Sequence, residues 1–231
     1  MSGEELLKLL EDNFGEKIHE FVVLQIGAND GVQDDLIRPL ITKYNPKSHL
    51  LEPVEQFFKS LSDNYKDYSN VVCHNIAISD TDGLKEMSVI KYDNSMPIWC
   101  KGLSTFDESL NFFSGFGGLG MAQDLRGETI YKQVSENKIK INVTTKKLET
   151  FLNENQINSI DVFVTDTEGH DFIIFNQLDL NKYSPKIIVM ETHQLGEEIN
   201  NLITDKLLKH GYSIVENSWD LIAINYNNLI N

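Results

Sequence analysis

Cysteine is scarce in this 231-residue chain, which has only Cys73 and Cys100, and the two are not spaced like zinc ligands. A disulfide framework is therefore excluded as the basis of the fold, and so is a cysteine-rich metal site. Two isolated thiols favour a reducing compartment, so we expect a cytoplasmic protein.

Long hydrophobic runs are also missing. No apolar stretch of the sequence approaches the roughly 20 residues that a membrane-spanning helix needs. The first residues, Met-Ser-Gly-Glu-Glu, do not resemble a secretory signal. The sequence thus predicts a soluble protein with no membrane span.

Basic residues are few, with 20 Lys and Arg against 35 Asp and Glu and a formal net charge of -15. Such a chain repels polyanions, so we expect no nucleic-acid partner. The hydrophobic content of 41% is sufficient for a substantial core. With no internal repeat in view, we expect one domain over residues 1–231.

One stretch near the N-terminus has the pattern of a ligand-binding strand and loop. Residues 21–26 are mostly apolar and rich in β-branched side chains, as in a strand buried on both faces of a parallel sheet. Residues 27–31, Gly-Ala-Asn-Asp-Gly, follow directly and allow a sharp turn that a ligand can approach closely. In open α/β sheets, nucleotide-like ligands bind at this kind of turn.

The remaining pattern alternates strands with helices, which is typical of an α/β fold. Residues 1–19 are expected to form an N-terminal helical extension. Residues 33–44 have helical spacing, and Pro39 either kinks that helix or marks its true beginning. Further segments are expected to be strands, at residues 48–51, 71–78, 139–143, 160–164 and 186–190, and the chain should end in a hairpin over residues 212–224.

Glu52 closes the second expected strand, 21 positions after Gly31. An acidic residue at this place can accept hydrogen bonds from both ribose hydroxyls of a bound nucleoside. Without the glycine turn, Glu52 would be interpreted as a surface carboxylate.

Asn75, Ile76 and Ala77 lie at the third expected strand, and with Ser79 they can face an adenine ring. Alternatively, Asn75 merely ties a turn to its own backbone. Farther along, Thr144 and Thr145 are expected to cap a helix that runs to about Leu152.

Residues 97–134 are the least regular part of the chain and combine glycines with phenylalanines. Long irregular segments of compact domains are often lids or binding loops. We therefore expect a substrate-side insertion or lid here. It is not a phosphate-binding loop, because no strand leads into it and no lysine follows its glycines.

Two neighbouring strand ends carry acidic residues and histidines. Asp166, Glu168 and His170 follow the strand at 160–164, and Glu191 and His193 follow the strand at 186–190. Such side chains can act as general bases, and histidine has the best-matched unperturbed pKa. Asp166, Glu191 and His193 can also ligate a divalent metal such as Mg²⁺, an interpretation that we do not favour.

Taken in order, these motifs resemble the FkbM-type S-adenosylmethionine-dependent methyltransferases. The resemblance covers roughly residues 21–191 and rests most strongly on the tip Asp166-Thr167-Glu168-Gly169-His170. It implies the class I methyltransferase, Rossmann-like fold, with helices on both faces of a mostly parallel sheet and a terminal antiparallel hairpin. One departure is Gln25, where the family usually has Asp, so Asp30 or Asp166 would have to contact the methionine amino group instead.

The resemblance also implies roles for individual residues. Asp166 would lie beneath the methyl donor, and the candidate catalytic bases are Asp166 and His170 first, then Glu168 and His193. The cofactor would be S-adenosylmethionine, held by residues from the three expected strand ends: Gln25, Gly27, Ala28, Asn29, Asp30, Gly31, Glu52, Asn75, Ile76, Ala77 and Asp166.

Family members mainly methylate hydroxyls, so the expected acceptor is a sugar, a glycan or a related metabolite, and a homo-oligomer is possible. Two alternatives stay open at this point. The glycine turn would also suit a nicotinamide-dependent oxidoreductase, although a full Gly-x-Gly-x-x-Gly is missing. The chain could instead be a non-catalytic interaction module built on a cofactor-binding fold.

Overall fold

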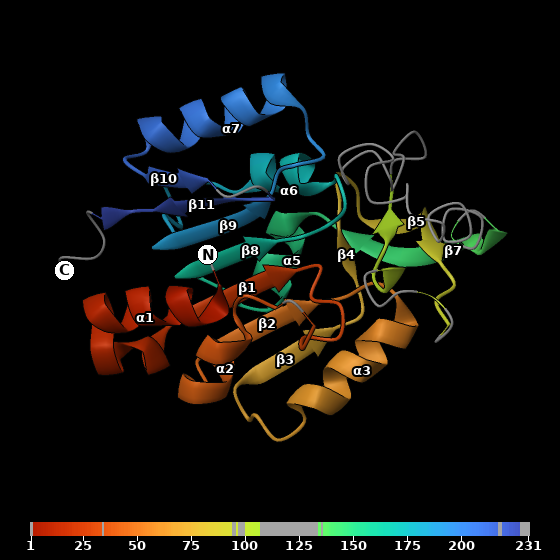
Figure 1. The fold of residues 1–231 in the computed structure, drawn as a ribbon, viewed down its shortest axis with the longest axis horizontal. Coiled ribbons are helices and arrows are strands. Elements are labelled where there is room, and N and C mark those ends of the chain that lie inside the picture. The colour runs from red at the N-terminus through yellow and green to blue at the C-terminus, as the bar shows by residue number, and fades with distance from the viewer. Residues whose placement is uncertain are drawn as a thin grey trace.

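The structure is a computed structural model and describes residues 2–33, 35–93, 96, 100–106, 134, 136–216 and 219–226. These residues form two β-sheets with helices packed around them (Figure 1). In chain order the elements are α1 (Gly3–Phe14), the 3₁₀ helix η1 (Gly15–Glu20), β1 (Val22–Ile26), α2 (Arg38–Tyr44), β2 (Lys47–Leu51), α3 (Glu55–Tyr65), β3 (Val71–His74), β4 (Ala77–Ile78), β5 (Gly83–Ile90), β6 (Ser104–Thr105), β7 (Lys138–Lys146), α5 (Leu148–Glu154), β8 (Val162–Thr165), α6 (Asp171–Gln177), β9 (Ile187–Glu191), α7 (Glu197–Lys209), β10 (Ser213–Glu216) and β11 (Asp220–Ile224).

The larger sheet has the strand order β10-β11-β9-β8-β1-β2-β3. Its strands from β3 to β9 are parallel, whereas β11 is antiparallel to both β9 and β10. The predicted class I architecture, with its terminal antiparallel hairpin, is therefore confirmed.

Successive residues of the central strands point to opposite faces of this sheet, as strand geometry requires. In β1, Leu24 and Ile26 pack into a core with α5, α6 and α7, while Val23 packs into a second core with α1, α2 and α3. Both faces are thus covered by helices. This explains why the strand sequences are continuous apolar runs rather than alternating ones.

The N-terminal segment has clear helix signals at both ends. Ser2 and Glu5 form a capping box at the start of α1, and Gly15 ends the helix in a backbone conformation with positive φ. Leu6, Leu10 and Ile18 are buried in the core that covers β1. Residues of the expected N-terminal extension therefore pack directly against the main sheet.

The second expected helix is shorter than predicted. It begins at Arg38 rather than near residue 33, and Pro39 lies in its first turn. Proline is tolerated there because the first amide groups of a helix have no intrahelical acceptor. Of the two interpretations of Pro39, the helix start is confirmed.

The expected strand at residues 71–78 divides into two strands that belong to different sheets. β3 extends the main sheet, and after a break at Asn75 the chain enters β4 of a smaller sheet ordered β4-β7-β5-β6. This smaller sheet lies beyond the end at which β1 and β2 finish (Figure 1). The helix cap predicted at Thr144 and Thr145 is wrong, because both residues pair within β7.

Of the expected insertion at residues 97–134, the structure describes only 100–106 and 134, so the rest of that prediction lies outside the described residues. β6, within the described part, pairs with β5. None of the helices among the described residues combines the length and apolarity needed to cross a bilayer.

Candidate functional site

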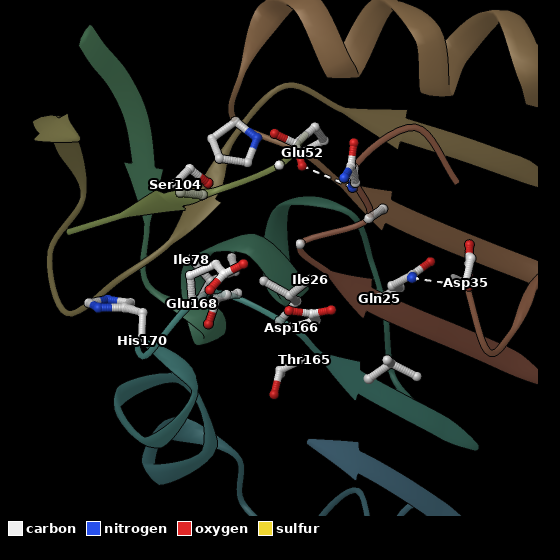
Figure 2. A pocket seen from close by; sticks show the side chains of 18 of the residues that line it. Gln25, Ile26, Asp35, Glu52, Ile78, Ser104, Thr165, Asp166, Glu168 and His170 are labelled. Carbon is white, nitrogen blue, oxygen red and sulfur yellow. Dashed lines mark hydrogen bonds between the residues drawn. The ribbon is translucent and has the colours of Figure 1, made fainter. Parts of the chain in front are cut away.

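A cavity of about 320 Å³ opens where β1, β2 and β8 end. This is the size of a site for a small organic ligand or cofactor. Figure 2 shows Gln25, Glu52 and Asp166 converging on it from different strand ends. Among the described residues, the ionisable lining consists of five carboxylates, one histidine and one lysine: Asp35, Glu52, Asp166, Glu168, Asp220, His170 and Lys101.

The turn after β1 brings backbone directly against backbone. Gly27 has a φ of +85°, and a Cβ there would lie 1.8 Å from the carbonyl oxygen of Asp166. Its N–H and that of Ala28 donate to the Leu51 carbonyl oxygen at 3.0 and 2.9 Å. Only glycine fits at position 27, so this loop forms one wall of the cavity next to Asp166.

Glu52 lines the cavity while being only 5% exposed. Its carboxylate accepts hydrogen bonds from the N–H groups of Asn29, at 3.0 Å, and Val54, at 2.8 Å. Burial raises the pKa of Glu52 to about 7, although these hydrogen bonds oppose the shift. The group therefore changes charge close to neutral pH.

The residues after β3 divide between support and lining. The Asn75 side chain donates to the backbone carbonyls of Glu52 and Pro53 at 3.0 and 3.1 Å, a tertiary contact rather than the expected bond to the backbone of its own turn. Ile76 and Ala77 line the cavity, whereas Asn75 does not. Two apolar residues thus line the cavity directly after Asn75, and Asn75 ties this part of the chain to the backbone at Glu52.

Gln25 and Asp35 form a buried polar pair at the other end of the lining (Figure 2). The Gln25 side-chain amide donates to Asp35 Oδ1 at 3.3 Å. Gln25 Oε1 and Asp35 Oδ2 are both enclosed, and neither has a hydrogen-bond partner among the described residues. Burial raises the pKa of Asp35 to about 6. Two buried acceptor oxygens are thus left without a donor, and both belong to residues that line the cavity.

Asp35 was not recognised as a site residue from the sequence. It lies in the loop between the glycine turn and α2, and no motif distinguishes it from the other acidic residues of the chain. Only the fold brings it against Gln25. Lys101, Phe106 and Asp220 also line the cavity without a sequence signal.

The tip after β8 concentrates negative charge. One carboxylate oxygen from each of Asp166, Glu168 and Glu191 lies within 4.8 Å of the others. Glu168 accepts a hydrogen bond from Gln194, and its backbone has a φ of +52°, a conformation uncommon for a residue with a side chain. The tip is therefore held in a specific shape.

These carboxyl groups are harder to ionise than usual. Asp166 is open to water through the cavity but surrounded by protein, and desolvation followed by repulsion from Glu168 raises its pKa well above the usual range. Desolvation also raises the pKa of Glu168 to about 7. For Glu191, desolvation and the Asp166 carboxylate raise the pKa strongly. A cationic ligand would relieve this repulsion.

His170 lines the cavity beside Glu168, with its ring 4.9 Å from that of Phe106 (Figure 2). Its Nε2 lies 3.1 Å from the hydroxyl oxygen of Ser79. Burial first, and then the nearby positive charge of Lys85, lower the pKa of His170 to about 4. The imidazole is thus neutral at physiological pH.

His193 lies apart from the cavity lining. Its Nδ1 is 3.3 Å from a carboxylate oxygen of Glu191, and its ring packs against Trp219 at 4.6 Å between centroids. It therefore touches the acidic tip only through Glu191.

Asp30 and Gly31, two of the predicted cofactor residues, support the loop instead of lining the cavity. Asp30 accepts hydrogen bonds from the N–H groups of Val32 and Gln33, both at 3.0 Å, and pairs with the Lys101 ammonium group. The Gly31 carbonyl accepts from two side chains of α2 and α3, Arg38 and Tyr65. Both residues act by holding the turn in place.

The sequence matches the methyltransferase FkbM domain over residues 25–214. A search of curated proteins found no match. Among solved structures, the chain is similar to a methyltransferase FkbM from Methylobacillus flagellatus KT, with 11% identity and a TM-score of 0.51 over 90% of this chain and 44% of that one. The chain thus spans less than half the length of that protein.

Two weaker structural similarities involve other methyltransferase folds. A precorrin-6y C5,15-methyltransferase from Geobacter metallireducens GS-15 has 11% identity and a TM-score of 0.41, over 88% of this chain and 79% of that one. An Aeropyrum pernix fibrillarin, solved with natively bound S-adenosyl-L-methionine, has 8% identity and a TM-score of 0.42, over 95% and 73%.

The domain match covers most of the sequence, and the chain is similar in fold to a solved FkbM methyltransferase. The chain therefore belongs to the FkbM family of S-adenosylmethionine-dependent methyltransferases.

Proposed function

We propose that this chain transfers a methyl group from S-adenosylmethionine to a hydroxyl of a sugar, a glycan or a related metabolite. One observation carries the proposal. A single cavity is lined by the glycine turn after β1, by Glu52, and by two candidate proton acceptors, Asp166 and His170. Membership of the family decides against the nicotinamide-dependent oxidoreductase as an alternative.

The polar groups of the cavity fit the chemistry of this cofactor. The enclosed, unpartnered oxygens of Gln25 and Asp35 suit the ammonium of its methionine part. Asp35 thereby supplies the carboxylate that the family usually has at position 25. Gly27, Ala28 and Asn29 would lie against the same part and the ribose, because all three line the cavity, with Gly27 packed directly against the Asp166 carbonyl.

The nucleoside would lie between Glu52 and the residues after β3. A charged carboxylate can accept hydrogen bonds from both ribose hydroxyls, since each of its oxygens can take more than the one backbone hydrogen bond it has here. Ile76 and Ala77 provide the apolar contact that an adenine ring needs.

The bound cofactor supplies an electrophilic methyl group, and the chain has two tasks toward the acceptor. The first is to hold the acceptor oxygen in line for attack, because orientation alone can contribute roughly 7–11 kcal/mol. The second is to accept the hydroxyl proton, which a positioned base accelerates by about 10²–10⁴-fold. Asp166, whose raised pKa makes it a stronger base than an ordinary aspartate, and His170, which is neutral, both suit this task.

We propose that the transfer does not require Mg²⁺. The oxygens of Asp166 and Glu191 are close enough to share a cation, but Glu191 also contacts His193, and Glu168 beside them accepts a hydrogen bond from Gln194. The cationic cofactor can itself offset the charge of these carboxylates.

The acceptor is expected to enter from the side of residues 97–134, of which Ser104 and Phe106 line the cavity. With a net charge of -15, the chain is unsuited to a nucleic-acid acceptor.

The test is to incubate the protein with methyl-labelled S-adenosylmethionine and a panel of sugars, glycans and small hydroxylated metabolites, with RNA as a further arm. We expect label on a hydroxyl oxygen of one class of carbohydrate or metabolite. Replacing the base, by Asp166→Asn or His170→Gln, should lower the rate by 100-fold or more, and Asp63→Asn, an exposed position on α3, should not change it. Label on nitrogen, carbon or RNA would contradict the proposal, as would cofactor binding without transfer to any acceptor, the behaviour of a non-catalytic module.

A further inference from the structure

The hydroxyl group of Ser79 is the centre of a polar network that connects the cavity to the surface. Ser79 is completely buried, in the turn between β4 and β5. Its Oγ lies 3.1 Å from His170 Nε2, 3.1 Å from Lys85 Nζ and 3.0 Å from a carboxylate oxygen of Asp80. His170 lines the cavity, whereas the Asp80 side chain is 60% exposed.

The partners of Ser79 determine the direction of each hydrogen bond. A serine hydroxyl has one proton to donate and two lone pairs to accept with. The Lys85 ammonium group can only donate, so it occupies one lone pair. Asp80 is ionised, because the hydrogen bond from Lys85 lowers its pKa, and an ionised carboxylate can only accept.

Ser79 must therefore give its single proton to Asp80. The remaining lone pair of Ser79 Oγ then accepts from His170, so His170 Nε2 must carry a proton. Because burial keeps the imidazole neutral, its other nitrogen, Nδ1, is left with a free lone pair.

Nothing in the described part of the chain competes for that lone pair. No hydrogen bond to His170 Nδ1 is present among these residues, and the atom is not one of the fully enclosed unpartnered ones. The ring packs against Phe106, which also lines the cavity. An acceptor nitrogen thus lies in the wall of the cavity. The hydrogen bond from the other ring nitrogen to Ser79 fixes the tautomer of the ring.

We propose that Ser79 and Asp80 are positioning residues that hold His170 as the Nε2–H tautomer, so that Nδ1 accepts the proton of the hydroxyl that is methylated. This inference rests on the proposed function and names the base that serves it. In the opposite tautomer, Nδ1 would carry a proton and donate it in a hydrogen bond to the acceptor hydroxyl. Nδ1 would then have no lone pair with which to accept the proton of that hydroxyl.

The proton and electron balance of the step is simple. The acceptor O–H bond breaks and an Nδ1–H bond forms on His170, while the acceptor oxygen forms its bond to the methyl carbon. The carbon–sulfur bond breaks and its electron pair stays on sulfur, which becomes a neutral thioether. His170 is left as an imidazolium ion, which returns its Nδ1 proton to water after the product leaves.

The tautomer can be measured directly, without an acceptor and without turnover. The full chain, with ¹⁵N-labelled histidine, is observed by NMR at about pH 7.5, and the His170 signals are assigned by their loss in His170→Gln. The unprotonated nitrogen of a neutral imidazole resonates far downfield of the protonated one. For the wild type, we expect Nδ1 at the unprotonated position and Nε2 at the protonated one.

Asp80→Ala tests the role of the network. With Asp80 removed, Ser79 can give its proton to His170 Nε2, so the two nitrogen shifts should move toward each other as both tautomers become populated. The matched control is Glu86→Ala, which removes an exposed carboxylate of β5, the strand that follows this turn, where it pairs with Lys140. That variant should leave both shifts unchanged.

A protonated Nδ1 or a mixture of tautomers in the wild type would overturn the inference, and so would wild-type shifts in Asp80→Ala. Binding of S-adenosylhomocysteine to the same samples is measured in parallel by calorimetry. If His170 is not the Nε2–H tautomer but S-adenosylhomocysteine binds, the inference fails and the proposed function stands. If the ligand does not bind, the proposed function fails regardless of the tautomer.

Discussion

Glu52 is the residue whose environment makes the most specific statement about ligand binding. Its pKa of about 7 means that it is about half ionised at neutral pH, and ribose hydroxyls need the ionised form as a strong acceptor. Binding of S-adenosylhomocysteine should therefore weaken as the pH falls below about 7, by up to tenfold per unit. Above that pH, affinity should be nearly constant.

Replacing Glu52 by Gln should remove both this pH dependence and much of the affinity. A hydrogen bond to a charged group contributes about 1.5–3 kcal/mol, which corresponds to a loss on the order of 10- to 100-fold in Kd. Calorimetry between about pH 6 and 8.5 measures both effects. Glu55→Gln, an exposed change at the start of α3, is the control. Unchanged affinity in Glu52→Gln would remove the ribose role.

Gly27 tests how closely the loop after β1 must approach Asp166. Gly27→Ala introduces a Cβ 1.8 Å from a carbonyl oxygen, at a φ of +85° that already disfavours alanine. Gly196→Ala has a comparable φ of +76° but open space around the new Cβ. We expect Gly196→Ala to cost about 1–3 kcal/mol of unfolding free energy from backbone strain alone, because its φ of +76° is combined with a ψ of 161°, a region that is essentially restricted to glycine.

Gly27→Ala should cost several kcal/mol more than that, because a backbone contact must be broken in addition. Urea denaturation followed by circular dichroism gives both values. Equal losses in the two variants would show that the loop can move away from Asp166 at little cost, contrary to the rigid wall described above.

The acidic tip gives a prediction about metal removal. If the cofactor offsets the charge of Asp166 and Glu191, treatment with EDTA should leave methyl transfer within about twofold of the untreated rate. Activity that is lost with EDTA, restored by Mg²⁺ and abolished in Glu191→Gln would contradict this and establish a metal site.

At the scale of elements, the neighbouring strands β2 and β3 share a histidine pair, in which His49 is buried and His74 half-buried. His49 Nδ1 lies 3.0 Å from His74 Nε2, and the ring of Phe151 in α5 packs against both. Burial lowers the pKa of each histidine to about 4. In the unfolded chain, both would take up protons near pH 6.5.

The sign of the pH effect follows from these values. Below about pH 6.5 the unfolded state binds more protons at these two sites, so stability falls as the pH is lowered toward about 4. The pair should account for a loss on the order of 3 kcal/mol over that interval, since one pKa unit corresponds to about 1.4 kcal/mol and His74 is only half-buried. Buried carboxyl groups such as Glu52 act in the opposite direction.

The contribution of the pair is therefore measured as a difference. Urea unfolding of the wild type and of His49→Leu/His74→Leu is compared between about pH 7.5 and 4.5. The difference in unfolding free energy should shift in favour of the double variant as the pH falls. A constant difference would mean that these histidines do not resist protonation in the fold. His19→Gln removes an exposed histidine of η1 and is the control, because it should leave the pH dependence of the unfolding free energy unchanged.

The elements that were predictable from sequence are those whose surroundings are uniform. β1, β8 and β9 are covered on both faces, so successive residues are buried and the sequence of each strand is a continuous apolar run. The division of residues 71–78 was not predictable, because what ends β3 is a tertiary contact of the Asn75 amide with the carbonyls of Glu52 and Pro53. The extension of β7 through Thr145 likewise depends on pairing with Gly83, 62 positions away in the chain.

The candidate site divides in the same way. Residues at strand ends, such as Glu52 and Asp166, could be predicted because parallel strands bring their carboxyl ends to one edge. Asp35 and Lys101 could not, because each reaches the cavity through a loop whose path the local sequence does not specify. For the same reason, the hydrogen bond between Ser79 and His170, which lie 91 positions apart, could not be predicted from the local sequence.

At the scale of the whole molecule, the charged lining of the cavity has the same negative sign as the net charge of the protein. The chain carries a net charge of -15, and the described lining of the cavity has five carboxylates against one lysine, which is itself paired with Asp30. A ligand with a positive centre therefore gains from this field, whereas a polyanion loses. This agrees with a sulfonium cofactor and a neutral, hydroxylated acceptor.

The most direct test of the central claim is the thermal unfolding of the whole chain with S-adenosylhomocysteine, compared with NADH. A ligand at about 100 times its Kd adds about 2.7 kcal/mol of stability, which for a chain of this size raises Tm by roughly 5–10 °C. We predict this increase for S-adenosylhomocysteine and none for NADH. No increase with S-adenosylhomocysteine at saturating concentration, or an equal increase with NADH, would contradict the account.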